Sequence, residues 1–175
     1  MSAASTQARV AGALDGVDFQ FSEPRDGMLT VEVSRRGLRA VLERLRGVAG
    51  FEQNTLITGV DRLPEDPRFE VVYQFLSFTH SDRVRVRARL GESDAVLPTC
   101  IDLWPGAAFS ERECWEMFGI RFEGHDPLER LLMPEAYEHF PLRKDFPHQG
   151  IEPDRLYREW DRARRATFKA EGGPA

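Results

Sequence analysis

The chain has 175 residues, of which 41% are hydrophobic and 30% charged, and this is the balance of one soluble globular domain with extensions. Its net charge of −5 argues against nucleic acid as the main partner, because phosphate binding needs a basic surface. No run approaches the roughly 20 consecutive apolar residues of a membrane span, and residues 1–16 lack the apolar core of a signal peptide, so we expect membrane association only through partners.

The N-terminal region is expected to begin with a flexible segment, residues 1–16, which are small and polar. Apolar and polar residues then alternate with period two at 17–21 and again at 28–33. Between these runs, Pro24 and the pair Asp26-Gly27 are residues typical of turns. The pattern predicts a β-hairpin.

A capped helix is expected next. Ser34 can cap its first turn, and Gly47 is a typical end residue. Its apolar residues follow the helical spacing i, i+3, i+4 and i+7, at Leu38, Val41, Leu42 and Leu45.

Three strands are predicted after this helix, at residues 55–60, 69–78 and 83–90. The last one alternates strictly and places four arginines on one side, Arg83, Arg85, Arg87 and Arg89. This stripe could bind phosphate or the acidic face of a partner. We favour a solvated strand face that also blunts a sheet edge, with carboxylates nearby to offset the charge.

Short helical segments are predicted at 97–104 and 110–118. In the second, Ser110 and Glu113 fit a capping box, Phe109 and Cys114 fit a hydrophobic staple, and Gly119 fits the end of the helix. On a helical wheel Glu111 shares an arc with the apolar residues Cys114, Trp115, Met117 and Phe118. A carboxylate buried there needs a cation or a donor, so we favour a structural or interface ion pair over a catalytic acid.

Motifs that would indicate catalysis or a cofactor are absent from the sequence. The possible metal ligands, Cys100, Cys114, His125, His139 and His148, lack zinc or iron–sulfur spacing. There is no phosphate-binding glycine loop and no nucleophile elbow. The two cysteines are expected to be free, buried thiols.

Residues 124–147 are apolar but interrupted by proline, and we call them the arm. Residues before proline favour extended backbone, so the arm cannot form a long helix. Its apolar side chains must therefore lie on a neighbouring protein or fold back on the chain's own domain, and both can hold in part.

Four segments together resemble the C-type, or thirty-kilodalton, subunit family of respiratory complex I. They read IDLWPGA from Ile101, ERECWEMFGI from Glu111, FEGH from Phe122 and PLRKDFP from Pro141. The resemblance implies an α+β fold in two layers, in which a helix, two strands, a helix and three strands form a mixed sheet followed by an extended C-terminal arm. The expected division is residues 1–16, a domain at 17–123, and the arm and tail at 124–175.

The resemblance also implies a function. The family member is a cofactor-free subunit of the peripheral arm of a proton-translocating NADH:quinone oxidoreductase, with no catalytic or metal-binding residues of its own. NADH, FMN, iron–sulfur clusters and quinone would bind in partner subunits, namely a hydrogenase-like large subunit and iron–sulfur subunits. The complex would lie on the cytoplasmic side of the plasma membrane.

The residues expected to contact these partners come from the matching motifs. They are Glu111, Arg112, Glu113, Trp115, Phe118, His125, Arg143, Lys144 and Asp145.

Three alternatives remain open. The first is the equivalent subunit of a membrane-bound hydrogenase or a coenzyme-F420 dehydrogenase, which would share the fold and differ in its partners. The second is a free-standing enzyme with Glu111 and Asp145 as an acid/base pair. The third is a small adaptor unconnected to respiration.

Overall fold

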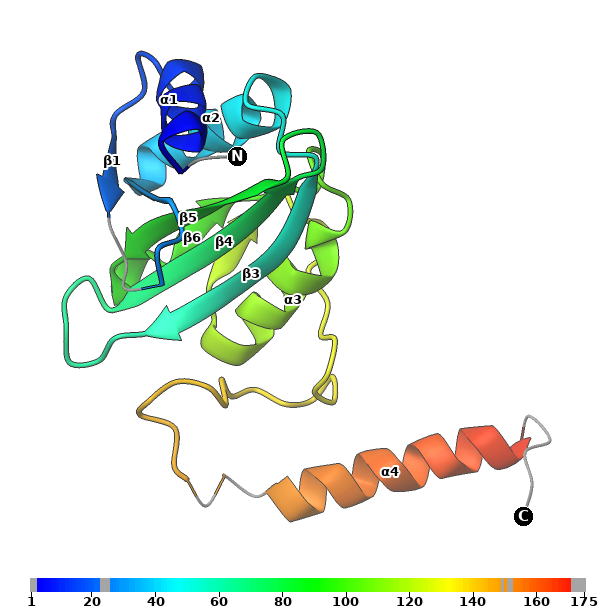
Figure 1. The fold of residues 1–175 in the computed structure, drawn as a ribbon. Coiled ribbons are helices and arrows are strands. Elements are labelled where there is room, and N and C mark those ends of the chain that lie inside the picture. The colour runs from blue at the N-terminus through cyan, green and yellow to red at the C-terminus, as the bar shows by residue number, and fades with distance from the viewer. Residues whose placement is uncertain (1–2, 23–25, 149, 151–152, 171–175) are drawn as a thin grey trace.

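The computed structural model describes residues 3–22, 26–148, 150 and 153–170. The first half contains α1 (Ala3–Ala13), β1 (Phe19–Ser22), β2 (Thr30–Val33), α2 (Arg35–Gly47), β3 (Gln53–Asp61), β4 (Phe69–Ser77) and β5 (Asp82–Leu90) (Figure 1). The predicted hairpin strands, capped helix and three further strands are thereby confirmed. The expected turn around Pro24 lies outside the described residues.

The five strands form one mixed sheet in the order β1-β2-β5-β4-β3. The pairs β1–β2, β3–β4 and β4–β5 are antiparallel, whereas β2 and β5 are parallel, with Val31 opposite Val86. A parallel pair needs a long crossover, which α2, β3 and β4 supply here. The expected α+β class with a mixed sheet is confirmed.

The core lies between the sheet and a layer of helices. Tyr73 and Phe75 of β4 are fully buried and belong to one apolar cluster with residues of α1, α2 and α3 (Ala107–Phe118). In α2, the Ser34 side chain accepts a hydrogen bond from the backbone N–H of Gly37, as its sequence position predicted. Figure 1 shows α1 and α2 over the β1–β2 side of the sheet and α3 beside β3.

The N-terminal segment differs from the expectation of a flexible end. Residues 3–13 form α1, and Val10 and Leu14 are fully buried against the core. Arg9 forms an ion pair with Asp82 at 2.5 Å and stacks over the Phe51 ring. Two apolar side chains spaced four residues apart thus hold this short N-terminal segment on the core, and the division at residue 17 stays a prediction.

The other face of the sheet carries the arginine stripe. Its ion pairs have N–O distances of 2.5–3.7 Å and are Arg85–Asp26, Arg87–Glu32, Arg87–Glu70, Arg89–Glu65 and Arg89–Glu70. The expected offsetting carboxylates are thus confirmed. The expectation that the stripe blunts an edge is wrong, because β5 lies between β2 and β4.

The second half contains η1 (Glu92–Asp94), β6 (Val96–Pro98), α3, β7 (Arg121–Glu123) and α4 (Pro153–Ala170). The helix predicted at 97–104 is wrong: β6 pairs in parallel with β7, a partner more than 20 residues away that local periodicity cannot reveal.

Helix α3 begins one turn earlier than predicted. Its N-cap is Gly106, which makes no side-chain cap bond, so the capping box at Ser110 is wrong. The staple is wrong as well, since Phe109 is 61% exposed. Pro105 and Gly106 end the preceding segment, so the helix begins at Ala107, before Ser110. Gly119 ends it in the left-handed conformation at φ 78°, as predicted.

In the described residues from Gly124 to Gly150 the chain forms no regular helix or strand, and α4 comes later in the sequence. Helix α4 was not predicted. Among the described residues, no helix is both long and apolar enough to cross a membrane.

Close packing of α3 on β3 makes Gly59 sensitive to substitution. A Cβ at this position would lie 2.6 Å from the Phe118 ring, whereas a Cβ at Gly12 in α1 would meet nothing within 4 Å. We expect Gly59→Ala to lower the free energy of unfolding by about 1–3 kcal/mol through overpacking. The control Gly12→Ala should raise it by about 0.5–1 kcal/mol, because alanine favours the helix. Urea unfolding of both variants measures this, and equal stability of the two would contradict it.

Candidate functional site

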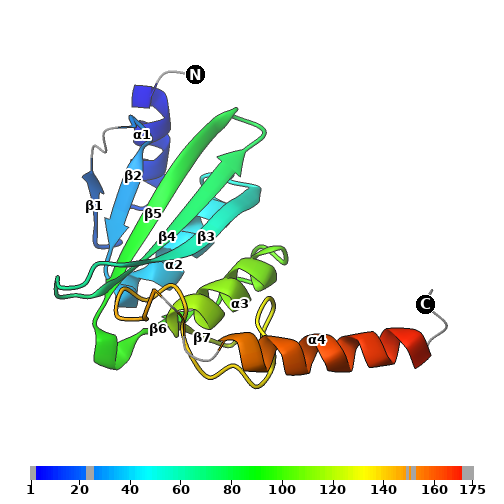
Figure 2. The same cartoon turned by 90° about the horizontal axis from the view of Figure 1, so that it is seen from below.

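The candidate site lies where α3 meets the arm. Figure 2 shows the chain passing α3 after β7 and continuing to α4. The contacts that hold the arm start from both ends of α3 and from the β3–β4 end of the sheet, and two carboxylates of α3 are at their centre.

Glu111 is one of these carboxylates and is fully buried. One oxygen accepts a hydrogen bond from the backbone N–H of Cys100 at 2.8 Å. The other accepts from the Thr99 hydroxyl at 2.6 Å and lies 2.9 Å from Nδ1 of His125. The expectation that a buried Glu111 has a partner is confirmed. These bonds join α3 to the end of β6 and to the start of the arm.

Glu116 is the second carboxylate and is also fully buried. Its oxygens accept hydrogen bonds from three successive backbone N–H groups, those of Leu131, Leu132 and Met133, at 2.6–3.2 Å. Bonds from backbone N–H groups to a carboxylate are stronger than bonds between neutral groups. Glu116 therefore fixes the backbone of the arm at the point where three donors would otherwise need water.

Arginines on α3 and in the arm add a second set of contacts. Arg112 donates to the backbone carbonyls of Glu129 at 2.8 Å and Arg130 at 2.7 Å. The Arg130 guanidinium lies over the rings of Trp115 and Tyr137, at 5.3 and 6.0 Å from their centroids. Tyr137 is buried, so the Arg130 guanidinium links a buried ring of the arm to the Trp115 ring of α3.

Arg143 fastens the far end of the arm. Its Nε donates to the carbonyl of Phe118 at 2.6 Å, and its guanidinium lies over the rings of Phe140 and Phe69 at 4.4 and 5.1 Å. A Cβ on Gly119 would lie 2.5 Å from the Arg143 guanidinium. Glycine at position 119 therefore serves both the left-handed helix end and this close approach.

A buried ion network joins the arm to the sheet. The Arg68 guanidinium binds Asp61 at 2.8 Å and Asp145 at 2.8 Å, and the side chain of Arg68 is only 6% exposed. The backbone N–H of Lys144 donates to Asp61 at 2.8 Å. The Arg68 guanidinium holds the pKa of both carboxyl groups, Asp61 and Asp145, below their usual values.

The structure brings most of the expected contact residues together, but within this chain. Glu111, Arg112, Phe118, His125, Arg143, Lys144 and Asp145 all take part in the contacts of α3, the arm and the nearby sheet. Trp115 lies under Arg130, and Glu113 is exposed on α3. The alternative that the arm folds back on its own domain therefore holds in the described residues, and contact with a partner stays a prediction.

Sequence reasoning missed Glu116, Asp61 and Arg68. Glu116 lies outside the apolar arc of the helical wheel, and its donors are backbone groups that carry no sequence signal. Asp61 and Arg68 flank the loop between β3 and β4, where they form an ion pair. Their opposite charges at the ends of two successive predicted strands were a sequence signal for this pair.

Glu111 and Asp145 are not placed as the acid/base pair that the free-standing enzyme alternative requires. Glu111 is bonded to Thr99, Cys100 and His125, and Asp145 to Arg68, so the two carboxylates belong to separate networks. Burial raises the pKa of both thiols, Cys100 and Cys114, which keeps them protonated and poorly nucleophilic. Within the described part of the chain, no three His, Cys, Asp or Glu residues are placed to hold a metal ion.

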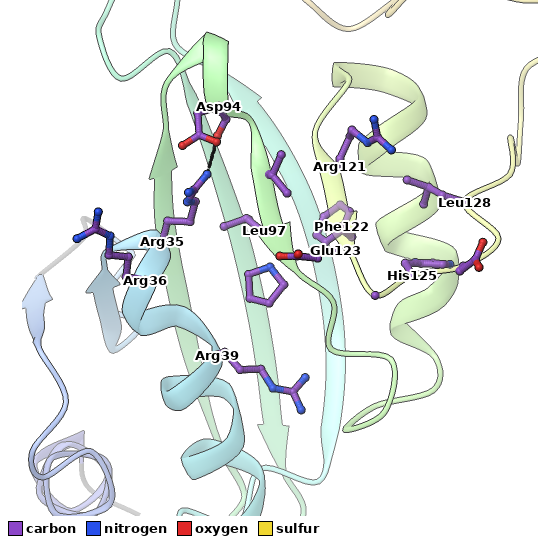
Figure 3. A pocket seen from close by; sticks show the side chains of 14 residues that line it. Arg35, Arg36, Arg39, Asp94, Leu97, Arg121, Phe122, Glu123, His125 and Leu128 are labelled. Atoms are coloured by element: carbon purple, nitrogen blue, oxygen red, sulfur yellow. Dashed lines mark hydrogen bonds and ion pairs between the residues drawn. The ribbon is translucent and has the colours of Figure 1, made fainter.

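A groove of about 1020 Å³ lies between the start of α2 and the β6–β7 pair (Figure 3). Arg35, Arg36 and Arg39 line it from α2, and Arg121 and Glu123 from β7. Because charges of both signs line this groove, it favours no single class of charged ligand.

Apolar side chains remain exposed after the arm has packed. Leu132 is 61% and Leu142 is 54% exposed, although their backbone N–H groups bond to Glu116 and to the carbonyl of Met117. We call these two residues the arm surface. Apolar side chains on a backbone that is already fixed can contact another protein without a further cost of ordering the segment.

Comparison with known proteins gives a consistent result. The family model described as "Respiratory-chain NADH dehydrogenase, 30 Kd subunit" matches residues 31–152. The C-type subunit of NADH-quinone oxidoreductase from Citrifermentans bemidjiense is 43% identical over 129 residues, which cover 74% of this chain and 79% of that protein. The C/D-type subunit of NADH-quinone oxidoreductase from Aquifex aeolicus is 46% identical over 121 residues, but these are only 20% of its length and 69% of this chain.

A solved structure supports the same relationship. The trypsin-resistant fragment 1–134 of Nqo5 is 33% identical and superposes with a TM-score of 0.59, over 70% of this chain and 94% of the fragment.

The Glu116 contacts lead to a test of how the arm is held. We expect Glu116→Gln to weaken arm docking by about 1.5–3 kcal/mol, since an amide nitrogen would replace one charged acceptor. Hydrogen exchange of the amides at 131–133 should then become at least about tenfold faster. Glu113→Gln, an exposed position on the same helix, is the matched control and should leave these rates unchanged. Equal protection in both variants would rule out the anchoring role of Glu116.

The Arg68 network leads to a test of pH dependence. The folded pKa of Asp61 lies below its ordinary 3.8, so its contribution to stability is present above about pH 5 and is lost as the pH falls through the folded value. We expect Asp61→Asn to cost on the order of 3 kcal/mol at pH 7, and this difference from the native chain should shrink on acidification. Urea unfolding from pH 7 to pH 2 measures it, with the exposed Asp66→Asn as control. A difference that does not change with pH would contradict the assignment.

Proposed function

Because the chain belongs to the family of the 30 Kd subunit of respiratory-chain NADH dehydrogenase, we propose that it is a cofactor-free subunit of a proton-translocating NADH:quinone oxidoreductase. In this proposal it supports assembly and has no catalytic residues of its own. NADH, FMN, iron–sulfur clusters and quinone bind in the partner subunits. The complex lies on the cytoplasmic side of the membrane, and the chain reaches the membrane only through it.

The observation that carries the proposal is the arm surface. Leu132 and Leu142 are exposed on a backbone that buried groups of α3 already hold in place. Ordering of an interface segment costs free energy on association, and a segment ordered beforehand lowers that cost. An arm fixed on its own domain is therefore a preformed docking element.

The proposed partner is the hydrogenase-like large subunit. The relative from Aquifex aeolicus carries the double name C/D and is about five times as long as the part that matches this chain. A single polypeptide that joins two subunits requires them to lie near each other. This supports the D-type subunit, which we take to be the large one, as the neighbour of the present chain.

The absence of a cofactor is supported by the chemistry of the buried groups. The two thiols are free and buried, and the buried carboxylates Glu111 and Glu116 are occupied by donors from the chain itself. The role left for these groups is to position the arm.

The arm surface provides the test of this function. We expect the double variant Leu132→Asp, Leu142→Asp to reduce recovery of the large subunit with the tagged chain by about tenfold or more, because central apolar contacts dominate interface energy. The matched control is Val48→Asp, Phe78→Asp, which changes two residues that are 69% and 64% exposed on other elements. Recovery in the control should stay within about twofold of the native chain.

Co-expression, affinity purification and protein quantification measure this recovery, and circular dichroism checks that both variants fold. If the arm variant recovers the large subunit as well as the control does, the arm surface is not the contact.

A further inference from the structure

Arg130 has a fixed place between α3 and the arm. Its guanidinium lies 5.3 Å from the centroid of the Trp115 ring and 6.0 Å from that of the Tyr137 ring. The backbone is held on both sides, because Arg112 donates to the Arg130 carbonyl at 2.7 Å and the following residue donates its N–H to Glu116 at 3.2 Å. The side chain therefore has little freedom left to lose when a partner binds.

The guanidinium of Arg130 has no hydrogen-bond acceptor among the described residues. Its Nη1 atom is buried and bonds to none of them. An arginine side chain keeps its positive charge throughout the physiological pH range. A buried donor without an acceptor is destabilising, and the penalty is larger when the group is charged. The described chain by itself thus leaves a charged N–H group unsatisfied.

The other arginines around the arm differ from Arg130 in this respect. Arg112 and Arg143 donate to backbone carbonyls, and Arg68 binds two aspartates. Within the described part of the chain, Arg130 is the one member of this group without such an acceptor. Buried donors in folded proteins nearly always have a partner. We therefore expect the acceptor of Arg130 to come from outside the chain.

A partner protein can reach this position. Arg130 as a whole is only partly buried, and Leu132 of the arm surface, two residues further along the chain, is 61% exposed. One contact can therefore cover both side chains. Arginine, tryptophan and tyrosine are also the residue types most enriched among those that dominate the binding energy of interfaces. An arginine stacked on two rings beside an exposed leucine has the composition of such an interface centre.

We propose that Arg130 anchors the arm surface to the large subunit by binding a carboxylate of that subunit. This rests on the proposed function, which supplies the partner. The planar guanidinium presents paired N–H groups whose spacing matches the two oxygens of a carboxylate, and such a pair fixes both distance and direction. The carboxylate supplies the negative charge and the acceptor that the described chain lacks, while Leu132 packs beside it.

A neutral acceptor fits this position less well. A backbone carbonyl of the partner could accept a hydrogen bond from Arg130, but the positive charge would stay uncompensated. Such a charge is costly once the contact has excluded water. Among the groups that a protein partner carries, the carboxylate answers both needs.

Removal of the charge tests the anchor in the full-length chain. The tagged chain is co-expressed with the large subunit, and affinity purification with protein quantification measures recovery. We expect Arg130→Met to reduce recovery by about tenfold or more, because loss of one partner leaves the other charge buried and unpaired. The matched control Arg83→Met removes the same charge from an exposed arginine of β5, and its recovery should stay within about twofold of the native chain.

Hydrogen exchange separates this anchor from a merely structural role within the arm. In Arg130→Met, exchange of the amides at 131–133 should stay within about twofold of the native chain, because Glu116 still holds them. Exchange as fast as in Glu116→Gln would assign Arg130 to the packing of the arm and overturn the proposal.

A chemical crosslink identifies the acceptor. The chain has only two lysines, Lys144 and Lys169, so an amine introduced by Arg130→Lys is readily assigned. A carbodiimide couples an amine to a carboxylate in direct contact, and mass spectrometry locates the product. We expect position 130 to become joined to an aspartate or glutamate of the large subunit, whereas Arg83→Lys should give no such product. No crosslink at position 130 would overturn the carboxylate as the acceptor.

The outcomes also distinguish this proposal from the function on which it rests. Equal recovery with Arg130→Met and Arg83→Met, together with loss in the arm-surface double variant, overturns the anchor and leaves the proposed function standing. Failure of the native chain to recover the large subunit overturns both.

Discussion

Two carboxylates that α3 buries completely govern the second half of this structure. A buried carboxylate without hydrogen-bond donors is costly, and the helix cannot supply donors from its own backbone at these positions. Glu111 finds them at the end of β6 and at His125, and Glu116 finds them in three successive amides of the arm. The irregular arm thereby gains a defined path, because a different path would leave buried carboxylates without some of their hydrogen-bond donors. Arg143 and Arg68 hold the rest of the arm by the same principle, with charged groups that the fold has removed from water.

Residue patterns predicted those parts of the fold that depend on neighbours in the sequence. The period of two in 83–90 and the apolar stripe of α2 each report the local backbone, and both were confirmed. Strand β6 was missed because its partner β7 comes after a whole helix, and the start of α3 was misplaced because a plausible cap at Ser110 lies inside the helix. Helix α4 was missed even though Pro153 suits a first helical position.

The sequence indicated which residues belong to the candidate site more than it indicated which partners they bind. Glu111 was expected to need a partner, and His125 was among the residues singled out, yet nothing in the sequence says that the two meet. Glu116 gave no signal, since its partners are main-chain amides and any residue could provide them. The residues expected to hold a neighbouring protein mostly hold the arm. Their part in assembly is therefore indirect under the proposed function: they shape the surface, and the exposed leucines Leu132 and Leu142 make the contacts.

The parallel pairing of β2 with β5 also has a consequence for the route to the folded state. Thr30 lies opposite Arg85, 55 residues further along the chain, whereas β3, β4 and β5 follow one another through short turns. Closing a long loop costs more entropy than closing a short one, so the three-stranded meander can assemble while β2 is still unattached. During that interval β5 is an open edge, and its alternating arginines make it a poor template for pairing with another unfolded molecule. The arginines that pair with carboxylates in the native sheet thus also disfavour aggregation of the nascent chain.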